Sequence, residues 1–375
     1  DRKKFKKQML SAKQEYENEK DESKKYDIEK RIARLNNLQL AKKVSLNSAY
    51  GALGSQYFRF YDLRMALGVT TAGQLSIRWI EAKINKYMNN LLKTDTDYVI
   101  ASDTDSIYLR MGDLVDKFLT GKSTEDTIKF MDKICEEKLQ PYIDKSYKEL
   151  ADYVHAYDQK MQMKREGLSD RGLWTAKKRY ILNVYNNEGV EYAKPKMKIM
   201  GLEAIKSSTP NACREKIKEA LEVILSKDQQ SLFDFVEEFR SEFRELDVAD
   251  IAFPRSANNL EKYKGTNGKI WGFKTPFHVR GCLVFNHIID VKKLGKKYEK
   301  IKEGEKIKFV YVKKPNPFNE DVIAFPQQLP KEFGLTDFID YDLQFKKTFL
   351  DALQTVIEPL GWKTEEQSSL EDFFG

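Results

Sequence analysis

The first fifty residues contain neither proline nor glycine, and no other feature of the sequence restricts the fold so strongly. The stretch is dense in Lys, Glu, Gln and Ala, which favour the α-helix. Ile28, Ile32 and Leu35 follow one another at helical spacing. We therefore expect two helices that are joined within residues 18–27, and a further amphipathic helix over residues 71–92.

Two short apolar runs, residues 98–100 and 107–109, flank the polar turn Asp103-Thr104-Asp105-Ser106. Runs of β-prone residues on either side of a turn predict a hairpin, and this one carries acids at its tip. The same Asp-Thr-Asp pattern at residues 95–97 is followed by only one apolar run, which indicates a loop. A third acid pair, within residues 340–342, indicates the start of a helix.

The remainder of the chain predicts a mixed fold with a separate C-terminal domain. Residues 124–163 have a helical pattern, and two β-like runs surround the turn at residues 186–189. Helical patterns return over residues 208–245 and 337–357, with a mixed stretch rich in aromatic and basic residues between them. From residue 363 the sequence is polar and predicts a tail.

The charge balance indicates which class of molecule the protein binds. There are 65 Lys and Arg residues against 58 Asp and Glu, so the net charge is +7, which suits a polyanion such as nucleic acid. Three cysteines and three histidines provide neither a disulfide framework nor a His-rich zinc centre, and they indicate a reducing, intracellular compartment. Since no apolar run is long enough to span a bilayer, we expect no membrane partner.

The hairpin tip is the candidate catalytic and metal site. Asp103 and Asp105 stand two residues apart, so their carboxylates can face a common Mg²⁺. Phosphoryl transfer uses such oxygen ligands, because paired metal ions stabilise both the attacking and the leaving oxygen. The alternative is an ordinary Asp-rich turn, in which the side chains bond to the local backbone.

A second group of residues could bind nucleotide. Lys43, Asn47 and Tyr50 share one face of the second helix and could hold a triphosphate beside a sugar and a base. Arg2 and Lys6, four residues apart on the first helix, could join them across an antiparallel pair. The alternative is a solvated lysine face with a buried tyrosine.

A basic strip interleaved with aromatic residues could bind a DNA backbone. It comprises Lys177, Lys178 and Tyr180 at a strand start, with Lys206 and further lysines downstream. The alternative is a lysine-rich sheet edge that resists aggregation. His278 and Arg280 could add phosphate contacts, although a single histidine is more often a structural donor.

The C-terminal tail carries Gln367, Leu370, Phe373 and Phe374 in the pattern QxxLxxFF. This is the type of peptide that sliding clamps accept, with one short helical turn placing the apolar side chains in a pocket. Two Phe residues on a polar tail otherwise have no reason to be exposed. The alternative is a tail that folds back onto its own domain.

Together these motifs resemble the C-terminal portion of the family B replicative DNA polymerases of the T-even bacteriophage type. The resemblance rests on KxxxNSxYG at residues 43–51, DTDS at 103–106, KKRY at 177–180, KIMGLEAIKSSTP at 198–210, SANN at 256–259 and PFHVRG at 276–281. It implies an α+β fold with part of the fingers as a helical hairpin at residues 1–54 and part of an antiparallel-sheet palm at 55–201. It further implies a mainly helical thumb at 202–362 and a clamp-binding tail at 363–375.

The resemblance also implies roles for the nucleotide and metal residues. Arg2, Lys6 and Lys43 match residues that bind the incoming dNTP. Asn47 matches a residue beside the triphosphate, and Tyr50 matches one that lines the nascent base pair.

The remaining matches concern the metals and the DNA. Asp105 matches the main ligand of the Mg²⁺ ions, and Asp103 matches its neighbour. Lys178 and Tyr180 match residues that grip the primer terminus and the minor groove, and Glu166 matches an acid near the metals.

Two departures from the family pattern shape the hypothesis. Ala101-Ser102 replaces the usual Tyr-Gly before DTDS, and the added side chain either crowds the primer end or shifts the turn. The second metal-binding motif, an Asp followed by Ser-Leu-Tyr-Pro-Ser, is absent from the sequence, as are the acids of a proofreading exonuclease. Asp105 alone would supply too few ligands for two Mg²⁺ ions.

These departures predict one subunit or fragment of a split DNA polymerase. An N-terminal polymerase half would contribute the first palm Asp and the exonuclease. The other partners would be primer-template DNA, dNTP and a sliding clamp. The protein would act in the cytoplasm of a bacteriophage-infected bacterial cell. A first residue of Asp1 fits a natural split or a truncated sequence. The alternatives are a catalytically inert DNA-binding and clamp-tethering module, and an unrelated Mg²⁺-dependent phosphotransferase.

Overall fold

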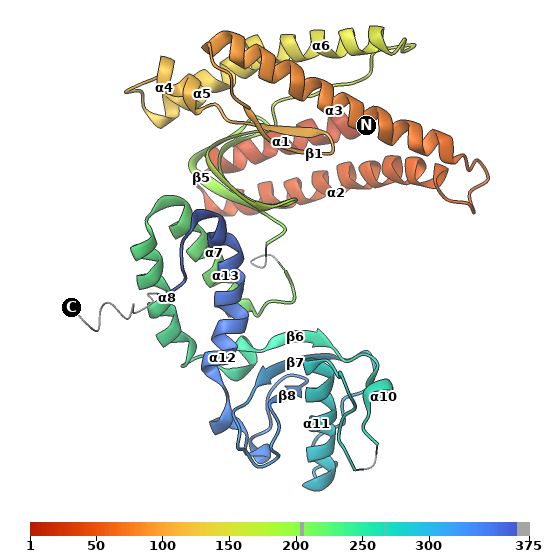
Figure 1. Ribbon diagram of the computed structural model, residues 1–375, viewed down its shortest axis with the longest axis vertical. Helices are drawn as coiled ribbons and strands as arrows, with labels where there is room; N and C mark the ends of the chain where they lie inside the picture. Colours follow the sequence, from red (N-terminus) through yellow and green to blue (C-terminus); the bar gives the residue numbers. More distant parts are fainter. Residues whose placement is uncertain (203–205, 267, 366–375) are drawn as a thin grey trace. The chain divides into compact units, whose positions relative to one another are not determined.

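The computed structural model describes residues 1–202, 206–266 and 268–365, and the chain divides into two compact units (Figure 1). The first unit comprises Asp1–Asp170 and Asn183–Lys196, and the second comprises Arg171–Leu182 and Met197–Gly375. Both units combine helices with small sheets, so the predicted α+β class is confirmed. No helix in the described part of the chain has the length and apolar character needed to cross a membrane.

Two long helices open the first unit. Helix α1 (Arg2–Asn18) and helix α2 (Glu22–Leu53) pack against each other, and their junction lies within the predicted region. Asp21 caps α2 because its side chain accepts a hydrogen bond from the Ser23 backbone N–H. The buried side chains of this pair are Met9, Ala12 and Ile28.

Helix α3 (Leu63–Leu92) begins eight residues before the predicted start. Asp62 caps it by accepting the Arg64 backbone N–H, a local signal that the apolar pattern does not contain. Every fourth residue from Ser76 to Leu92 is buried, and this stripe faces the core of the first unit.

The predicted acidic hairpin is confirmed. Strands β1 (Val99–Asp103) and β2 (Ser106–Leu109) are antiparallel, with Asp103 opposite Ser106 across the turn. Among the described residues these two strands form a sheet of their own.

The helical region that follows starts at Thr124 as predicted, but it ends earlier and is preceded by an additional helix. It consists of α4 (Gly112–Phe118), α5 (Thr124–Ile134), a π-helical turn (Cys135–Leu139) and α6 (Gln140–Tyr153). Helix α4 was not predicted, and α6 ends ten residues early, shortly before His155 adopts a left-handed φ of 52°. These helices bury Leu114, Met131 and Leu150 against the α3 stripe.

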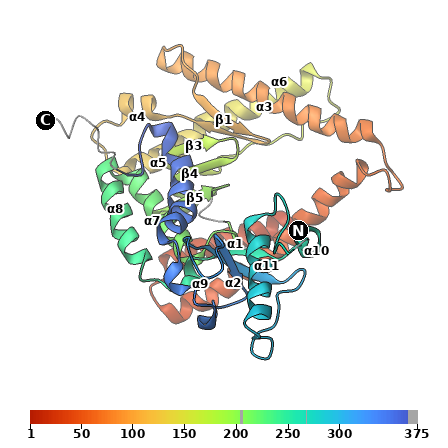
Figure 2. The same cartoon turned by 60° about the horizontal axis from the view of Figure 1, so that its bottom comes forward.

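Strands β3 (Gly167–Ala176), β4 (Arg179–Asn187) and β5 (Val190–Met200) form one sheet in that order (Figure 2). Each of these strands contributes residues to both units. The hairpin between β4 and β5 was predicted. Strand β3 was not, because Gly167, Asp170, Arg171 and Gly172 interrupt its apolar alternation.

The second unit has a helical core that was predicted in outline. It is formed by α7 (Asn211–Ser226), α8 (Gln229–Phe243), α12 (Tyr341–Phe345), a π-helical turn (Lys346–Leu350) and α13 (Asp351–Ile357). The Asp340 side chain accepts the Leu343 backbone N–H, so the predicted helix start there is confirmed. A 3-10 turn at Glu358–Leu360 follows α13.

A second core in this unit lies between a sheet and a helix. The sheet has the order β6 (Phe253–Ser256), β7 (Lys306–Tyr311) and β8 (Val322–Phe325), all antiparallel, and α11 (Phe277–Val291) packs beside β8 (Figure 1). Glycine at position 281 allows this approach, because a Cβ there would lie 2.7 Å from the Ala324 backbone nitrogen. The short elements are α9 (Val248–Ile251), α10 (Leu260–Tyr263) and the 3-10 turns Lys331–Phe333 and Thr336–Phe338.

Candidate active site

The tip of the β1–β2 hairpin presents the two carboxylates that the sequence singled out. Asp103 is the last residue of β1, and the Asp105 backbone N–H donates to its carbonyl oxygen at 2.6 Å. Thr104 occupies the left-handed region with a φ of 57°, and its hydroxyl donates to the Asp103 carboxylate at 2.9 Å. The turn is therefore tight and locally braced, with Asp105 exposed and Asp103 half-buried.

A buried tyrosine lies close enough to this tip to respond to its charge. Burial raises the pKa of Tyr147 on α6, and the negative charge of Asp105 raises that pKa further. Sequence reasoning missed Tyr147, because its position on the buried face of α6 resembles an ordinary core residue.

The two carboxylates could provide some of the oxygen ligands that a hard cation needs. Mg²⁺ is usually held by one or two carboxylates with water and substrate phosphates, and Asp103 and Asp105 could provide this share of the ligands. Within the described residues there is no group of three or more His, Cys, Asp or Glu side chains that could enclose a metal ion.

The predicted face of α2 is present and open. Lys43 and Asn47 are exposed, and Tyr50 retains 39% of its accessible surface. The Tyr50 hydroxyl lies 3.5 Å from the Ala66 carbonyl oxygen on α3, to which it can donate. The exposed Lys43 fits the alternative of a solvated lysine face, whereas Tyr50 is not buried as that alternative expected.

On α1 the structure adds a contact that was not predicted. The Lys6 ammonium donates to the Glu188 carboxylate at 2.7 Å, which joins α1 to the turn between β4 and β5. Arg2, one turn earlier, is half-buried, and its buried Nε has no hydrogen-bond partner among the residues that the structure describes.

The predicted strand start at Lys177 is wrong by two residues, because strand β4 begins at Arg179. Lys177 and Lys178 form the two-residue turn between β3 and β4, both exposed, and Lys178 has a φ of 64°. Tyr180 is 7% exposed, and its ring centroid is 6.1 Å from that of Trp174. Lys206 is half-buried and follows a gap in the described residues.

Arg280 and His278 lie on α11 in the second unit. The Arg280 guanidinium donates to both oxygens of Asp321, at 2.6 and 2.9 Å, and lies 4.1 Å from the Trp271 ring centroid. Burial and the nearby charge of Arg255 lower the pKa of His278, so its ring favours the neutral form. Contacts from these two residues to DNA remain predictions.

The four predicted clamp-binding residues, Gln367, Leu370, Phe373 and Phe374, lie outside the described residues.

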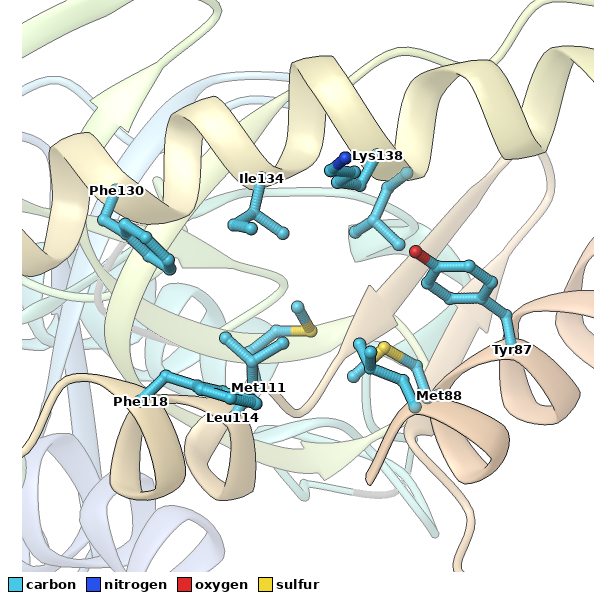
Figure 3. Close-up of a pocket in the computed structure, with 10 residues that line it drawn as sticks. Tyr87, Met88, Met111, Leu114, Phe118, Phe130, Ile134 and Lys138 are labelled. Atoms are coloured by element: carbon cyan, nitrogen blue, oxygen red, sulfur yellow. The ribbon is translucent and has the colours of Figure 1, made fainter. Parts of the chain in front are cut away.

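A pocket of about 400 Å³ in the first unit has a different character from the hairpin tip (Figure 3). Its lining comes from α3, α4, α5, the π-helical turn and Met111, which directly precedes α4, and includes Met88, Phe118 and Phe130. Lys138 is the one charged side chain among the lining residues, and none is a carboxylate. This lining suits apolar contact and does not suit metal-dependent chemistry.

Comparisons with known proteins agree on one family. A family model described as DNA polymerase family B matches residues 3–360. The chain is 38% identical over 365 residues to the DNA-directed DNA polymerase of Enterobacteria phage T4, an alignment that covers 93% of this chain and 40% of that protein. It is also 38% identical over 352 residues to the DNA-directed DNA polymerase of Escherichia phage RB69, covering 90% of this chain and 38% of that protein.

More distant similarity extends beyond phages. DNA polymerase beta of African swine fever virus is 27% identical over 113 residues, which is 30% of this chain and 9% of that protein. The chain spans about two fifths of the length of the two phage relatives.

Proposed function

The chain belongs to DNA polymerase family B, of the T-even bacteriophage type, and we propose that it forms the C-terminal part of a replicative DNA polymerase. In this proposal the polymerase joins the primer 3′-hydroxyl to the α-phosphate of a dNTP and releases pyrophosphate. Residues 1–54 act as part of the fingers, 55–201 as part of the palm and 202–362 as the thumb. The observation that carries the proposal is the pair of carboxylates on a tight hairpin tip, within a chain that matches the family over nearly its whole length.

In the first unit, different residues bind the metal ions, the triphosphate and the base of the nucleotide. Asp105 and Asp103 provide oxygen ligands for Mg²⁺, which when bound supplies positive charge that stabilises the transferred phosphoryl group. Lys43 lies on the open face of α2, and together with Arg2 and Lys6 it binds the triphosphate through charge-assisted hydrogen bonds. Asn47 lies beside the triphosphate, and the exposed ring of Tyr50 lines the nascent base pair.

Residues of the second unit bind the primer-template. Lys177 and Lys178 are exposed in a short turn, which suits contact with backbone phosphates. We assign Tyr180, which is 7% exposed, and the half-buried Lys206 to the same role, and the neutral ring of His278 can donate a hydrogen bond to phosphate. Arg280, held by Asp321, contributes chiefly by positioning α11.

An N-terminal polymerase half would complete the molecule, and exposed apolar residues support this part of the proposal. Residues 38–75, from the second half of α2 to the first half of α3, expose an unusual number of large apolar side chains. They are Leu38, Leu40, Val44, Leu46, Tyr50, Tyr57, Phe58, Phe60, Tyr61, Leu63, Met65, Leu67, Val69 and Leu75. We call this set the 38–75 apolar surface.

The palm sheet supports the same conclusion. The hairpin β1–β2 is a two-stranded sheet, which is marginal by itself, and Ile100 on β1 is 48% exposed. A further strand from the N-terminal half would bury this residue and extend the sheet. That half would also supply the additional metal-binding Asp and the exonuclease.

We further propose a binding partner and a cellular location. Gln367, Leu370, Phe373 and Phe374 would bind a sliding clamp, and the enzyme would act in the cytoplasm of a phage-infected bacterium. The alternative is a catalytically inert DNA-binding and clamp-tethering module. Such a module would use the same basic residues and the same tail, and it would have no need of the two carboxylates.

Primer extension with an Asp105→Asn variant separates the two functions. The chain is mixed with the N-terminal half of a phage relative, Mg²⁺, dNTPs and primer-template DNA. The matched control is Asp95→Asn, which removes an exposed carboxylate from the other Asp-Thr-Asp copy. We expect Asp105→Asn to lower the extension rate at least about a hundredfold with primer-template binding retained, and Asp95→Asn to leave it unchanged. Equal rates for the two variants would favour the tethering module.

A further inference from the structure

A row of polar contacts joins helix α1 to the hairpin β4–β5 within the first unit. Lys6 pairs with Glu188 at 2.7 Å, and Gln14 bonds to the backbone of Glu191, accepting its N–H at 2.8 Å. Glu17 forms an ion pair with Lys196. Positions 6, 14 and 17 lie on one side of a helix, so α1 lies along the hairpin through this face.

Glu188 is the rigidly placed member of this row. It adopts a left-handed φ of 53°, and its backbone N–H donates to the Glu166 carbonyl oxygen at 2.5 Å. The side chain of Asn186, which is 1% exposed, accepts the Gly189 N–H at 3.1 Å and the Arg165 guanidinium at 2.5 Å. Arg165 is itself paired with Asp132. The turn is therefore held from both sides, and the Glu188 carboxylate is pre-positioned.

We propose that the Glu188 carboxylate is paired with the Lys6 ammonium in the nucleotide-free protein. When a nucleotide binds, its triphosphate replaces Glu188 as the partner of Lys6. The proposal rests on the proposed role of Lys6 as a phosphate ligand and adds a residue that sets nucleotide affinity. A triphosphate carries more negative charge than one carboxylate, so it can displace Glu188 from Lys6. Nucleotide binding must nevertheless break the Lys6–Glu188 pair. The free energy of nucleotide binding is therefore less favourable by the free energy of that pair.

The arrangement also gives the fingers a defined resting position. While Lys6 is paired with Glu188, the Gln14 and Glu17 contacts keep α1 aligned along the hairpin. Exchange of Glu188 for phosphate at Lys6 releases one end of this row, which is the end nearest Arg2. Glu188 is thus a positioning and affinity-determining residue, and it is not catalytic in the sense of contacting the reacting atoms.

The test compares Glu188→Gln with Glu191→Gln in the full chain. Both variants remove one negative charge from the same hairpin, but the two hydrogen bonds between Gln14 on α1 and Glu191 use the Glu191 backbone. Binding of inorganic triphosphate to the chain is measured by calorimetry. Because both members of the pair are partly exposed, with 37% and 25% of their side-chain surfaces accessible, we expect a modest effect. Glu188→Gln should lower the dissociation constant about two- to fivefold, and Glu191→Gln should leave it unchanged.

A double-substitution cycle identifies the partner. In a Lys6→Met background the chain should bind triphosphate more weakly, and Glu188→Gln should then have no effect. Glu188→Asp, which keeps the charge but shortens the reach to Lys6, should tighten binding in the same direction and serves if the Gln variant does not fold. Unchanged or weaker binding by a folded Glu188→Gln chain would overturn the inference, as would a wild-type chain that binds no triphosphate.

A kinetic measurement separates this inference from the proposed function. In primer extension with the N-terminal half, Glu188→Gln should lower KM for dNTP and leave kcat within about twofold, whereas loss of a merely structural ion pair would not lower KM. Absence of extension by the wild-type mixture would count against the polymerase assignment. The triphosphate titration does not depend on extension, so it still decides the role of Glu188.

Discussion

Gly201 lies directly against the backbone of Lys178. A Cβ at position 201 would be 2.3 Å from the Lys178 carbonyl oxygen, a distance that no real contact reaches. Both residues have positive φ, 69° for Gly201 and 64° for Lys178. The glycine of the KIMGLE motif therefore allows β5 to end against the KKRY turn, and it fixes the position of the lysine that we assign to the primer.

Gly201→Ala should disrupt this contact. The side chain would meet backbone on one side and force a strained φ, so we expect a loss of about 1–3 kcal/mol in the free energy of unfolding. Urea denaturation of the full chain measures it. The control is Gly73→Ala in α3, where a Cβ would meet nothing within 4 Å and should be neutral or stabilising. Equal stabilities for the two variants would show that Gly201 is not required at this position.

His278 should make the second unit less stable in mild acid. Its pKa in the folded chain is lowered from 6.5 by burial and by the charge of Arg255. The unfolded chain therefore binds this proton more readily than the folded chain, and stability falls as the pH drops below about 6.5. His278→Gln should remove this part of the pH dependence in unfolding measurements at pH 7.5 and 5.5. The control, His155→Gln, removes an exposed histidine, and a similar change in both variants would contradict the prediction.

The 38–75 apolar surface should matter for association and not for folding. Leu46 is 64% exposed, so Leu46→Lys should change the stability of the chain by less than about 0.5 kcal/mol. If the N-terminal half buries this side chain, the same substitution should weaken their association at least about tenfold. Analytical ultracentrifugation or a surface-binding assay measures the affinity. Leu360→Lys, at a 40% exposed leucine in the second unit, is the matched control and should have no effect on association.

The elements that could be predicted from the sequence are those with local signals. The acidic hairpin follows from two apolar runs around a turn, and the helix at Tyr341 follows from its capping Asp340. Strand β3 could not be predicted, because Gly167 and Gly172 together with two charged residues interrupt the alternation on which strand prediction depends. Its identity as a strand comes from pairing with β4.

The candidate site was predictable as a set of residue types but not as a set of contacts. Asp103, Asp105 and Lys43 could be selected by pattern and resemblance. The Lys6–Glu188 pair joins residues 182 positions apart, and the influence of Asp105 on Tyr147 also depends on tertiary packing. Neither has a local signal, because each side chain fits its own element without reference to the other.

A stoichiometric titration tests whether this chain and an N-terminal half together form a DNA polymerase. The rate of single-nucleotide addition to a primer is measured as the N-terminal half is added to a constant amount of this chain with Mg²⁺. If the two halves together form the polymerase, we expect little or no addition by either half alone, and a rate that rises to a plateau at about one half per chain. A mixture that associates and binds primer-template but adds no nucleotide at any ratio would contradict it.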